Sequence, residues 1–296
     1  MSIADPDTFE FPSGCVIPAK SPPVMLRPPT DPEELGKLEF LTIDHMSVSR
    51  HGVWKQCHQQ YKYKYHLKVI PDREEPCYFV YGKIVHRAAE EYVKRKGKTP
   101  ILHCAGEVFA GKLKLEENQT VAPKLPKEYS RDQLISHLRA IESVHQRIGF
   151  SGETEWPFLF DLDPPHNRCV KGFIDRLIIT KDKSKAFILD YKTSKKNGWR
   201  KTRSNIHQDL QLRTYGLVVN RTFGIAPENI RGALFYLEGA EIIDARFTQS
   251  SLDAAGTELL QAYKQVQGMQ ANDVWGNPGN HCMRCDFNGI CPFFAS

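Results

Sequence analysis

The stretch Phe187–Lys192, FILDYK, decides how the rest of the chain is interpreted. Its apolar residues lead into Asp190, Tyr191 and Lys192, which is the pattern of a buried strand that ends in charged groups. Side chains alternate along a strand, so Asp190 and Lys192 share one face and Tyr191 points to the other. A carboxylate and an ammonium at the end of an apolar strand are costly to leave unpaired.

A second apolar segment, residues 170–180, carries Asp175 within GFIDRLII, and the polar run KDKSK separates it from the first. The two segments therefore predict a hairpin that brings Asp175 and Asp190 together. Two close carboxylates repel each other unless a proton or a cation lies between them, and Mg²⁺ prefers oxygen ligands. With Lys192 to orient a water, this pattern favours metal-assisted phosphodiester hydrolysis. A lone D-x-K is short, however, and more often marks a surface ion pair.

The surrounding motifs provide a family resemblance. GFIDRLII and FILDYKTSKK resemble the paired core motifs of the PD-(D/E)XK nuclease superfamily. YGKIVHRAAEE with His86, QLRTY with Gln211 and Tyr215, and the terminal cysteines resemble its RecB-like branch. That branch includes the CRISPR-associated exonucleases and the nuclease domains of AddAB helicases. The matched motifs extend from Cys57 to Cys291.

The resemblance implies an α/β fold with a restriction-endonuclease-like core, a central mixed sheet flanked by helices, and a helical appendage stapled by an iron–sulfur cluster. It also implies a metal-dependent DNA exonuclease that acts on DNA ends or single strands in recombination, repair or replication. By this resemblance, Mg²⁺ or Mn²⁺ would be bound by His86, Asp175, Asp190 and the Tyr191 carbonyl. Lys192 would position the attacking water. Gln211 and Tyr215 would support the site or the strand.

Two other functions stay open at this point. One is a structure-selective endonuclease with the same site, and the other is a non-catalytic DNA-binding or adaptor subunit with a relic core. The intact Asp–Asp–Lys set argues against a relic. No G-x-x-x-x-G-K-[ST] motif is present, so a DNA motor would have to be a separate helicase or recombination protein.

The terminal segment HCMRCDFNGICPFF places Cys282, Cys285 and Cys291 in C-x2-C-x5-C spacing. Iron–sulfur clusters and structural zinc both take four cysteines, and the second C-x-x-C pair of a zinc ribbon is absent. The family resemblance places the fourth ligand upstream of the histidine motif, where Cys57 stands. We therefore expect a 4Fe-4S cluster, with zinc as the alternative. The other candidates for the fourth ligand are Cys77 and Cys104.

Hydrophobic periodicity predicts the remaining elements. Helices are expected over residues 42–68, 81–96, 130–148, 205–220 and 250–268, with caps at Thr42-Ile43-Asp44 and Ser130. Strands are expected over 155–160, 231–238 and 241–247. Residues 97–128 are rich in glycine, lysine and proline, and we expect a loop that covers the cleft.

Three polar features have both a functional and a structural interpretation. A histidine such as His86 is usually structural, and only the family resemblance favours a metal ligand. Glu155 could hydrogen-bond to a metal-bound water or protect a sheet edge. The run Tyr61–Tyr65 alternates tyrosine with lysine, which fits either DNA stacking or an amphipathic element with inward tyrosines.

A dense group of cations follows the catalytic strand, in TSKKNGWRKTRS. Such runs are usually solvated, but this position favours a loop that tracks DNA phosphates, with Trp199 as a stacking platform. The cations are Lys195, Lys196, Arg200, Lys201 and Arg203.

Composition sets the limits of these expectations. The chain has 296 residues, 41% of them hydrophobic, and a formal net charge of +5, which suits a polyanionic partner without proving one. Neither an apolar run that could span a membrane nor a secretory leader is visible, so we expect the cytoplasm of a bacterial, archaeal or phage-infected cell. Residues 1–36 are proline-rich and predict an extended arm, and residues 37–296 predict one nuclease domain closed by the cluster between Cys57 and the tail.

Overall fold

A computed structural model of the chain describes residues 38–71, 75–117, 119–194 and 200–294. The described chain forms two compact units. The first contains Glu75–Trp156 and Phe173–Gln249, and the second contains residues 38–71, Pro157–Gly172 and 250–294. The proline-rich arm predicted for residues 1–36 lies outside the described residues.

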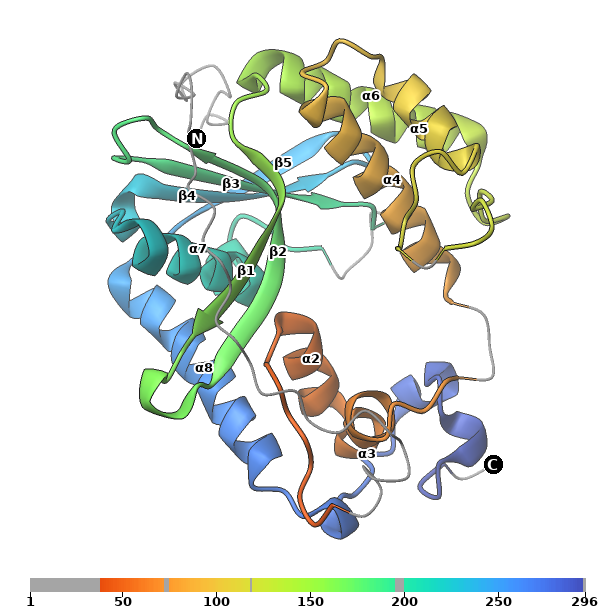
Figure 1. Ribbon diagram of the computed structural model, residues 1–296, viewed down its shortest axis with the longest axis vertical. Helices are drawn as coiled ribbons and strands as arrows, with labels where there is room; N and C mark the ends of the chain where they lie inside the picture. The colour runs from red at the N-terminus through yellow and green to blue at the C-terminus, as the bar shows by residue number, and fades with distance from the viewer. Residues whose placement is uncertain (1–37, 72–74, 118, 195–199, 295–296) are drawn as a thin grey trace. The chain divides into compact units, whose positions relative to one another are not determined.

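The chain forms a five-stranded mixed sheet of order β1-β2-β3-β4-β5, of which β3, β4 and β5 lie wholly in the first unit (Figure 1). Strands β2 and β3 are antiparallel, β3 and β4 are parallel, and β4 and β5 are antiparallel. The mixed sheet with flanking helices agrees with the predicted α/β class. The strands are β1 (Glu153–Asp161), β2 (Cys169–Ile179), β3 (Ala186–Lys192), β4 (Ile230–Tyr236) and β5 (Glu241–Arg246).

The predicted β2–β3 hairpin is confirmed, and its ladder ends close to the charged residues. Pairing runs from Ile179 opposite Ala186 to Arg176 opposite Leu189. Beyond Leu189, β3 continues its pairing only with β4, as far as Lys192. The end of β3 is therefore free of β2 where the charged side chains begin.

Three helices cover one face of this sheet: α4 (Cys77–Lys94), α5 (Ile101–Phe109) and α6 (Arg131–Ile148) (Figure 1). Their apolar stripes form one core cluster with Leu189, Tyr191 and Phe235 from β3 and β4. The Ser130 side chain caps α6, as predicted, by accepting a hydrogen bond from the backbone N–H of Gln133. Burial of these stripes, rather than helix propensity, supplies most of the stabilisation of such helices.

The parallel β3–β4 pair requires a crossover, and α7 (Leu210–Phe223) provides it on the other face of the sheet (Figure 1). Asp209 caps the start of α7, and Gly224 ends it in the left-handed conformation. This crossover brings the Gln211 end of α7 to the carboxyl end of β3. Ligand sites of open α/β sheets commonly lie outside the carboxyl ends of their strands.

The second unit is largely helical. It contains α2 (Val48–Gln56), α3 (His58–Tyr61), a π-helical turn η2 (Lys62–His66), α8 (Gln249–Gln267), and the short turns η7 (Asn280–Arg284) and η8 (Asn288–Ile290). Trp54 in α2 donates to the Gln265 side chain in α8, and Tyr263 donates to the Ile43 carbonyl. These bonds attach the first described residues of the chain to its last long helix.

Two local expectations are wrong. The first described helix does not start at Thr42–Asp44, because Ser47 caps α2 while Asp44 pairs with Arg50. Residues 97–128 are not all loop, because residues 101–109 form α5, whose Ile101 and Cys104 are fully buried. The helix was missed because only nine residues of periodic sequence stand between polar flanks that contain glycine, lysine and proline. None of the described helices has the length and apolar content needed to cross a membrane.

Candidate functional site

The end of the β2–β3 ladder creates the first contact of the site. Because backbone pairing with β2 stops at Leu189, the backbone N–H of Tyr191 donates instead to the side chain of Asp175, at 2.8 Å from Oδ2. Asp175 is buried, with 8% of its surface exposed. The carboxylate of β2 is therefore fixed by the backbone of β3, between Asp190 and Lys192.

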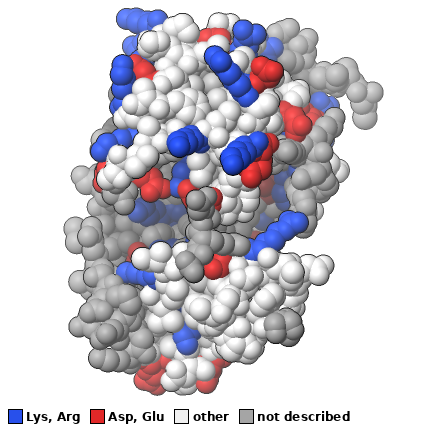
Figure 2. All heavy atoms as spheres, turned by 90° about the vertical axis from the view of Figure 1, so that its right-hand side faces the viewer, with Lys and Arg blue, Asp and Glu red and all other residues white. Residues whose placement is uncertain are grey.

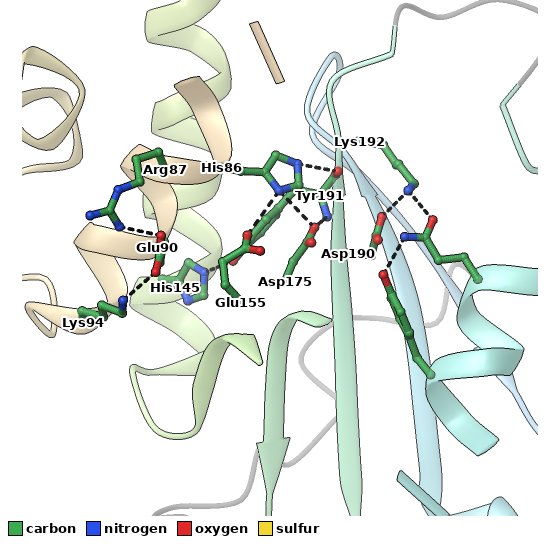
Figure 3. Close-up of polar contacts among 12 residues, drawn as sticks. His86, Arg87, Glu90, Lys94, His145, Glu155, Asp175, Asp190, Tyr191 and Lys192 are labelled. Atoms are coloured by element: carbon green, nitrogen blue, oxygen red, sulfur yellow. Dashed lines mark hydrogen bonds and ion pairs between the residues drawn. The ribbon is translucent and has the colours of Figure 1, made fainter. Parts of the chain in front are cut away.

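His86 faces this carboxylate from α4 (Figure 3). Its Nδ1 lies 3.4 Å from Asp175 Oδ2 and 3.5 Å from Glu155 Oε1, while Nε2 lies 3.2 Å from the Tyr191 carbonyl oxygen. The carbonyl can only accept, so Nε2 carries the proton and Nδ1 is the nitrogen turned toward the carboxylates. The predicted proximity of His86 and Asp175 is thus observed.

Asp190 and Lys192 lie together on the α7 side of β3, as strand alternation predicts. Lys192 Nζ lies 2.6 Å from Asp190 Oδ2 and donates to Gln211 Oε1 at 2.8 Å. Gln211 Nε2 in turn donates to the Tyr215 hydroxyl at 2.7 Å. The predicted Gln211 and Tyr215 therefore belong to a chain of polar contacts that ends on the lysine.

The charged groups of α4, β2 and β3 shift one another's pKa values. Burial, with Asp175 adding repulsion, raises the pKa of Asp190 to about 7 although Lys192 opposes the shift. Burial would lower the pKa of His86, but Asp175 and Glu155 hold it well above its usual value. The pKa of Asp175 is lowered despite its burial, because His86 and Lys192 favour its charged form. Such opposed shifts in neighbouring groups are typical of functional sites.

The phenol of Tyr191 points to the opposite face of the sheet, where it meets His145 of α6 (Figure 3). Burial and the neighbouring Arg176 together lower the pKa of His145 to about 3, so the ring is neutral and accepts from the hydroxyl. Sequence reasoning missed His145. The available signal was its position on the buried stripe of α6, in line with Leu134, Leu138 and Ile141.

The predicted cysteines lie in the second unit, and three of them are near neighbours. Burial raises the pKa of Cys285, and the adjacent Cys57 and Cys291 raise it further. Cys57 is buried at the end of α2, whereas Cys282, Cys285 and Cys291 are partly exposed in the final turns. All cysteines of the described residues are free thiols. The two alternative candidates for the fourth ligand belong to the first unit instead. Cys104 is part of its core, and Cys77 packs against that core.

The predicted phosphate-tracking loop is only partly described, because Lys195, Lys196 and Trp199 lie outside the described residues. Arg200 does not fit the predicted role of tracking phosphates, because its side chain is 7% exposed, stacks on the Tyr236 ring at 4.7 Å and donates to the Glu238 carbonyl. Arg203 is exposed and Lys201 is half-buried. Only these last two remain available to DNA among the described cations of that run.

The tyrosines of residues 61–65 favour the structural interpretation. Tyr61 is fully buried, and Tyr63 packs on the Phe287 ring and donates to the Ile290 carbonyl. Arg50 lies 4.9 Å from the centre of the Tyr65 ring. These rings therefore hold the second unit together.

The face drawn in Figure 2 carries basic and acidic side chains side by side. Along α4, Arg87 and Lys94 both pair with Glu90, and Arg95 pairs with Glu91. Such interspersed charges do not form the continuous basic stripe expected of a strong DNA-binding surface.

The donor atoms of the first unit suit a hard divalent cation. Among the described residues, His86, Glu155 and Asp175 form the group whose ligand atoms all lie within 4.8 Å of one another. Asp190 Oδ2 is buried and lacks a hydrogen bond of good geometry, although Lys192 Nζ is close to it. Carboxylates with one imidazole form a site at which Mg²⁺ or Mn²⁺ can bind and retain waters.

Comparison with known proteins identifies the family of the chain. The family model of the PD-(D/E)XK nuclease superfamily matches residues 45–292. The structure resembles a candidate exonuclease from Eubacterium rectale, with 17% identity, a TM-score of 0.49, and coverage of 85% of this chain and 91% of that chain. It also resembles the protein SSO0001, with 16% identity, a TM-score of 0.36, and coverage of 81% and 96%. No curated protein shows a significant match.

Proposed function

Because the chain belongs to the PD-(D/E)XK nuclease superfamily, we propose that it is a Mg²⁺- or Mn²⁺-dependent deoxyribonuclease that degrades DNA from its ends. The observation that supports this most is the arrangement at the end of β3. There His86, Asp175 and the Asp190–Lys192 pair lie around the carboxyl end of one strand. The biological setting that we propose is recombination, repair or replication.

The cation would be held by His86, Asp175 and Asp190, with the Tyr191 carbonyl beside them. The fit rests on the donor set and on the buried Asp190 oxygen described above. When bound, such a cation lowers the pKa of a coordinated water and neutralises charge on the phosphate.

Lys192 is the residue that would position the attacking water. Its pKa is raised, because the Asp190 carboxylate outweighs the effect of burial, so the ammonium stays charged. An ammonium offers donors only, so it holds a water by the oxygen and leaves the oxygen's protons free to depart. Gln211 fixes the lysine through its Oε1, and Tyr215 fixes the amide of Gln211.

In the second unit, we propose that Cys57, Cys282, Cys285 and Cys291 bind a 4Fe-4S cluster. The proximity of Cys57 and Cys291 to Cys285 supports this ligand set over Cys77 or Cys104. A zinc ribbon would need a second C-x-x-C pair, which the sequence lacks. The role of the cluster would be structural, since it would join Cys57 to the tail.

DNA is the proposed partner, as single strands or duplex ends, together with a separate helicase or recombination protein. Purified protein should be incubated with linear and covalently closed circular DNA, each single- and double-stranded, with Mg²⁺ or Mn²⁺. Mononucleotides or short products from linear DNA, with circles left intact, are the expected result. Nicked or linearised circles would favour the endonuclease alternative, and binding without cleavage would favour a non-catalytic subunit.

A further inference from the structure

The backbone of Glu155 departs from its strand. Glu155 lies within β1, yet its φ is +46°, in the left-handed region that residues other than glycine seldom adopt. One such residue interrupts the alternation of side chains along a strand and re-aims the side chain, as bulges beside active sites do. The Glu155 carboxylate is thereby brought to His86, with Oε1 3.5 Å from Nδ1 (Figure 3).

The neighbouring strand fixes this conformation. Arg176 of β2 is fully buried and donates to the Glu153 carbonyl at 3.1 Å. At Gly152, with φ +93°, an added Cβ would lie 2.3 Å from the Leu177 carbonyl oxygen. These contacts therefore restrict the backbone at the start of β1 to one conformation. Unfavourable backbone conformations persist only where the surroundings determine them in this way, and they cluster at ligand sites.

A charge that protects a sheet edge would point to solvent, but Glu155 does not. Its side chain is 31% exposed, and the ion pair that the described residues show for it is the one with His86. His86 Nε2 meanwhile donates a hydrogen bond to the Tyr191 carbonyl oxygen, at 3.2 Å. Metal-binding histidines commonly donate their second ring N–H to a carbonyl or carboxylate, which fixes the ring and leaves the first nitrogen for the cation.

We infer that Glu155 is a direct ligand of the active-site cation, together with His86 through Nδ1 and Asp175. The inference rests on the proposed nuclease function and refines its ligand set. The Tyr191 carbonyl then orients His86, and Glu155 takes the place in the shell that the carbonyl was expected to fill. Three ligands that are already gathered in the free protein allow the cation to bind before DNA does.

The test measures Mn²⁺ binding by the full-length protein without DNA, by the electron paramagnetic resonance signal of free Mn²⁺ and by calorimetry. Loss of an outer partner of a metal site weakens binding 10- to 100-fold, so loss of a direct ligand in Glu155→Gln or Glu155→Gly should raise the Kd for Mn²⁺ by more than about 100-fold. The matched control is Glu153→Gln, which removes an exposed carboxylate from the same strand and should leave the Kd unchanged. A Kd that stays at the wild-type value, or rises by less than about 100-fold, would overturn the inference, because an outer partner alone accounts for that range.

Asp175→Asn separates this inference from the function on which it rests. If Asp175→Asn loses Mn²⁺ and Glu155→Gln keeps it, the ligand assignment of Glu155 fails while the nuclease site stands. If the wild-type protein itself binds no Mn²⁺, both fail. Metal-free Glu155→Gly should also melt above Glu155→Gln, by about 2–4 °C for each kcal/mol of relieved backbone strain. A lower Tm for the glycine variant would contradict the role of the left-handed backbone.

Discussion

His145 Nε2 accepts a hydrogen bond from the Tyr191 hydroxyl beneath the sheet, and both side chains are buried. The backbone of the same tyrosine donates to the Asp175 carboxylate and accepts from His86. One residue of β3 therefore connects helix α6 to two of the proposed metal ligands. The position of β3 relative to α4 and α6 depends on this connection.

Tyr191→Phe should lower the free energy of unfolding by about 1–3 kcal/mol, because it leaves the buried Nε2 of His145 without its donor. Urea denaturation followed by circular dichroism measures the change. Tyr78→Phe is the control, since the Tyr78 ring is 55% exposed and its hydroxyl should contribute little. Equal stability of Tyr191→Phe and the wild type would show that the pair contributes nothing to stability.

The pH dependence of stability should reveal His145. Its pKa is about 3 in the folded protein, against an ordinary value of 6.5, so between these values the unfolded chain binds a proton that the folded chain does not bind. Its contribution is therefore complete above the unfolded pKa and is lost as the pH falls toward the folded value. The expected slope between about pH 6 and about pH 4.5 is about 1.4 kcal/mol per pH unit.

His145→Gln should remove that slope, because glutamine does not titrate in this range and can still accept from Tyr191. The quantity to compare is the difference in unfolding free energy between the two proteins at each pH, in which most other titrating groups cancel. A constant difference across this pH range would mean that His145 titrates normally.

Much of this site was predictable, because it depends on strand alternation and short motifs. Asp190, Tyr191 and Lys192 take the faces that a period of two requires, and the hairpin brings Asp175 beside them. What the sequence could not predict depends on backbone detail and tertiary contact. The left-handed φ of Glu155, the partner of Tyr191 on α6 and the burial of Arg200 against Tyr236 all follow from neighbours far along the chain.

Arg200 and Arg203 should behave differently although they stand three residues apart. Arg203→Ala should weaken DNA binding and reduce the slope of log affinity against log salt by about 0.7–0.9 if the arginine contacts one phosphate. Arg200→Ala should instead lower stability, because the buried guanidinium bonds to Glu238 and stacks on Tyr236. Fluorescence anisotropy over a salt series and thermal melts measure the two effects. The reverse assignment of effects would place Arg200 on DNA.

The proposed iron–sulfur cluster should give the purified protein a visible colour. Protein purified without oxygen should be brown, with about four irons and four sulfides per chain. Cys57→Ala should lose the colour as fully as Cys285→Ala, since the two thiols are neighbours, and protease resistance should fall with it. Cys77→Ala is the control and should stay brown. Colourless protein with stoichiometric zinc would refute the cluster, and a brown Cys57→Ala protein would refute its ligand set.

The central claim is that the carboxylates and the lysine at the end of β3 hydrolyse DNA with a divalent cation. The direct measurement is the rate at which purified wild-type protein, Asp190→Asn and Lys192→Met degrade end-labelled linear DNA with Mn²⁺. The wild type should cleave and should stop on addition of a chelator. Each variant should be slower by about a thousandfold or more, or about 4 kcal/mol of barrier, with its melting and DNA binding largely retained. Cleavage by Asp190→Asn at near the wild-type rate would contradict the account.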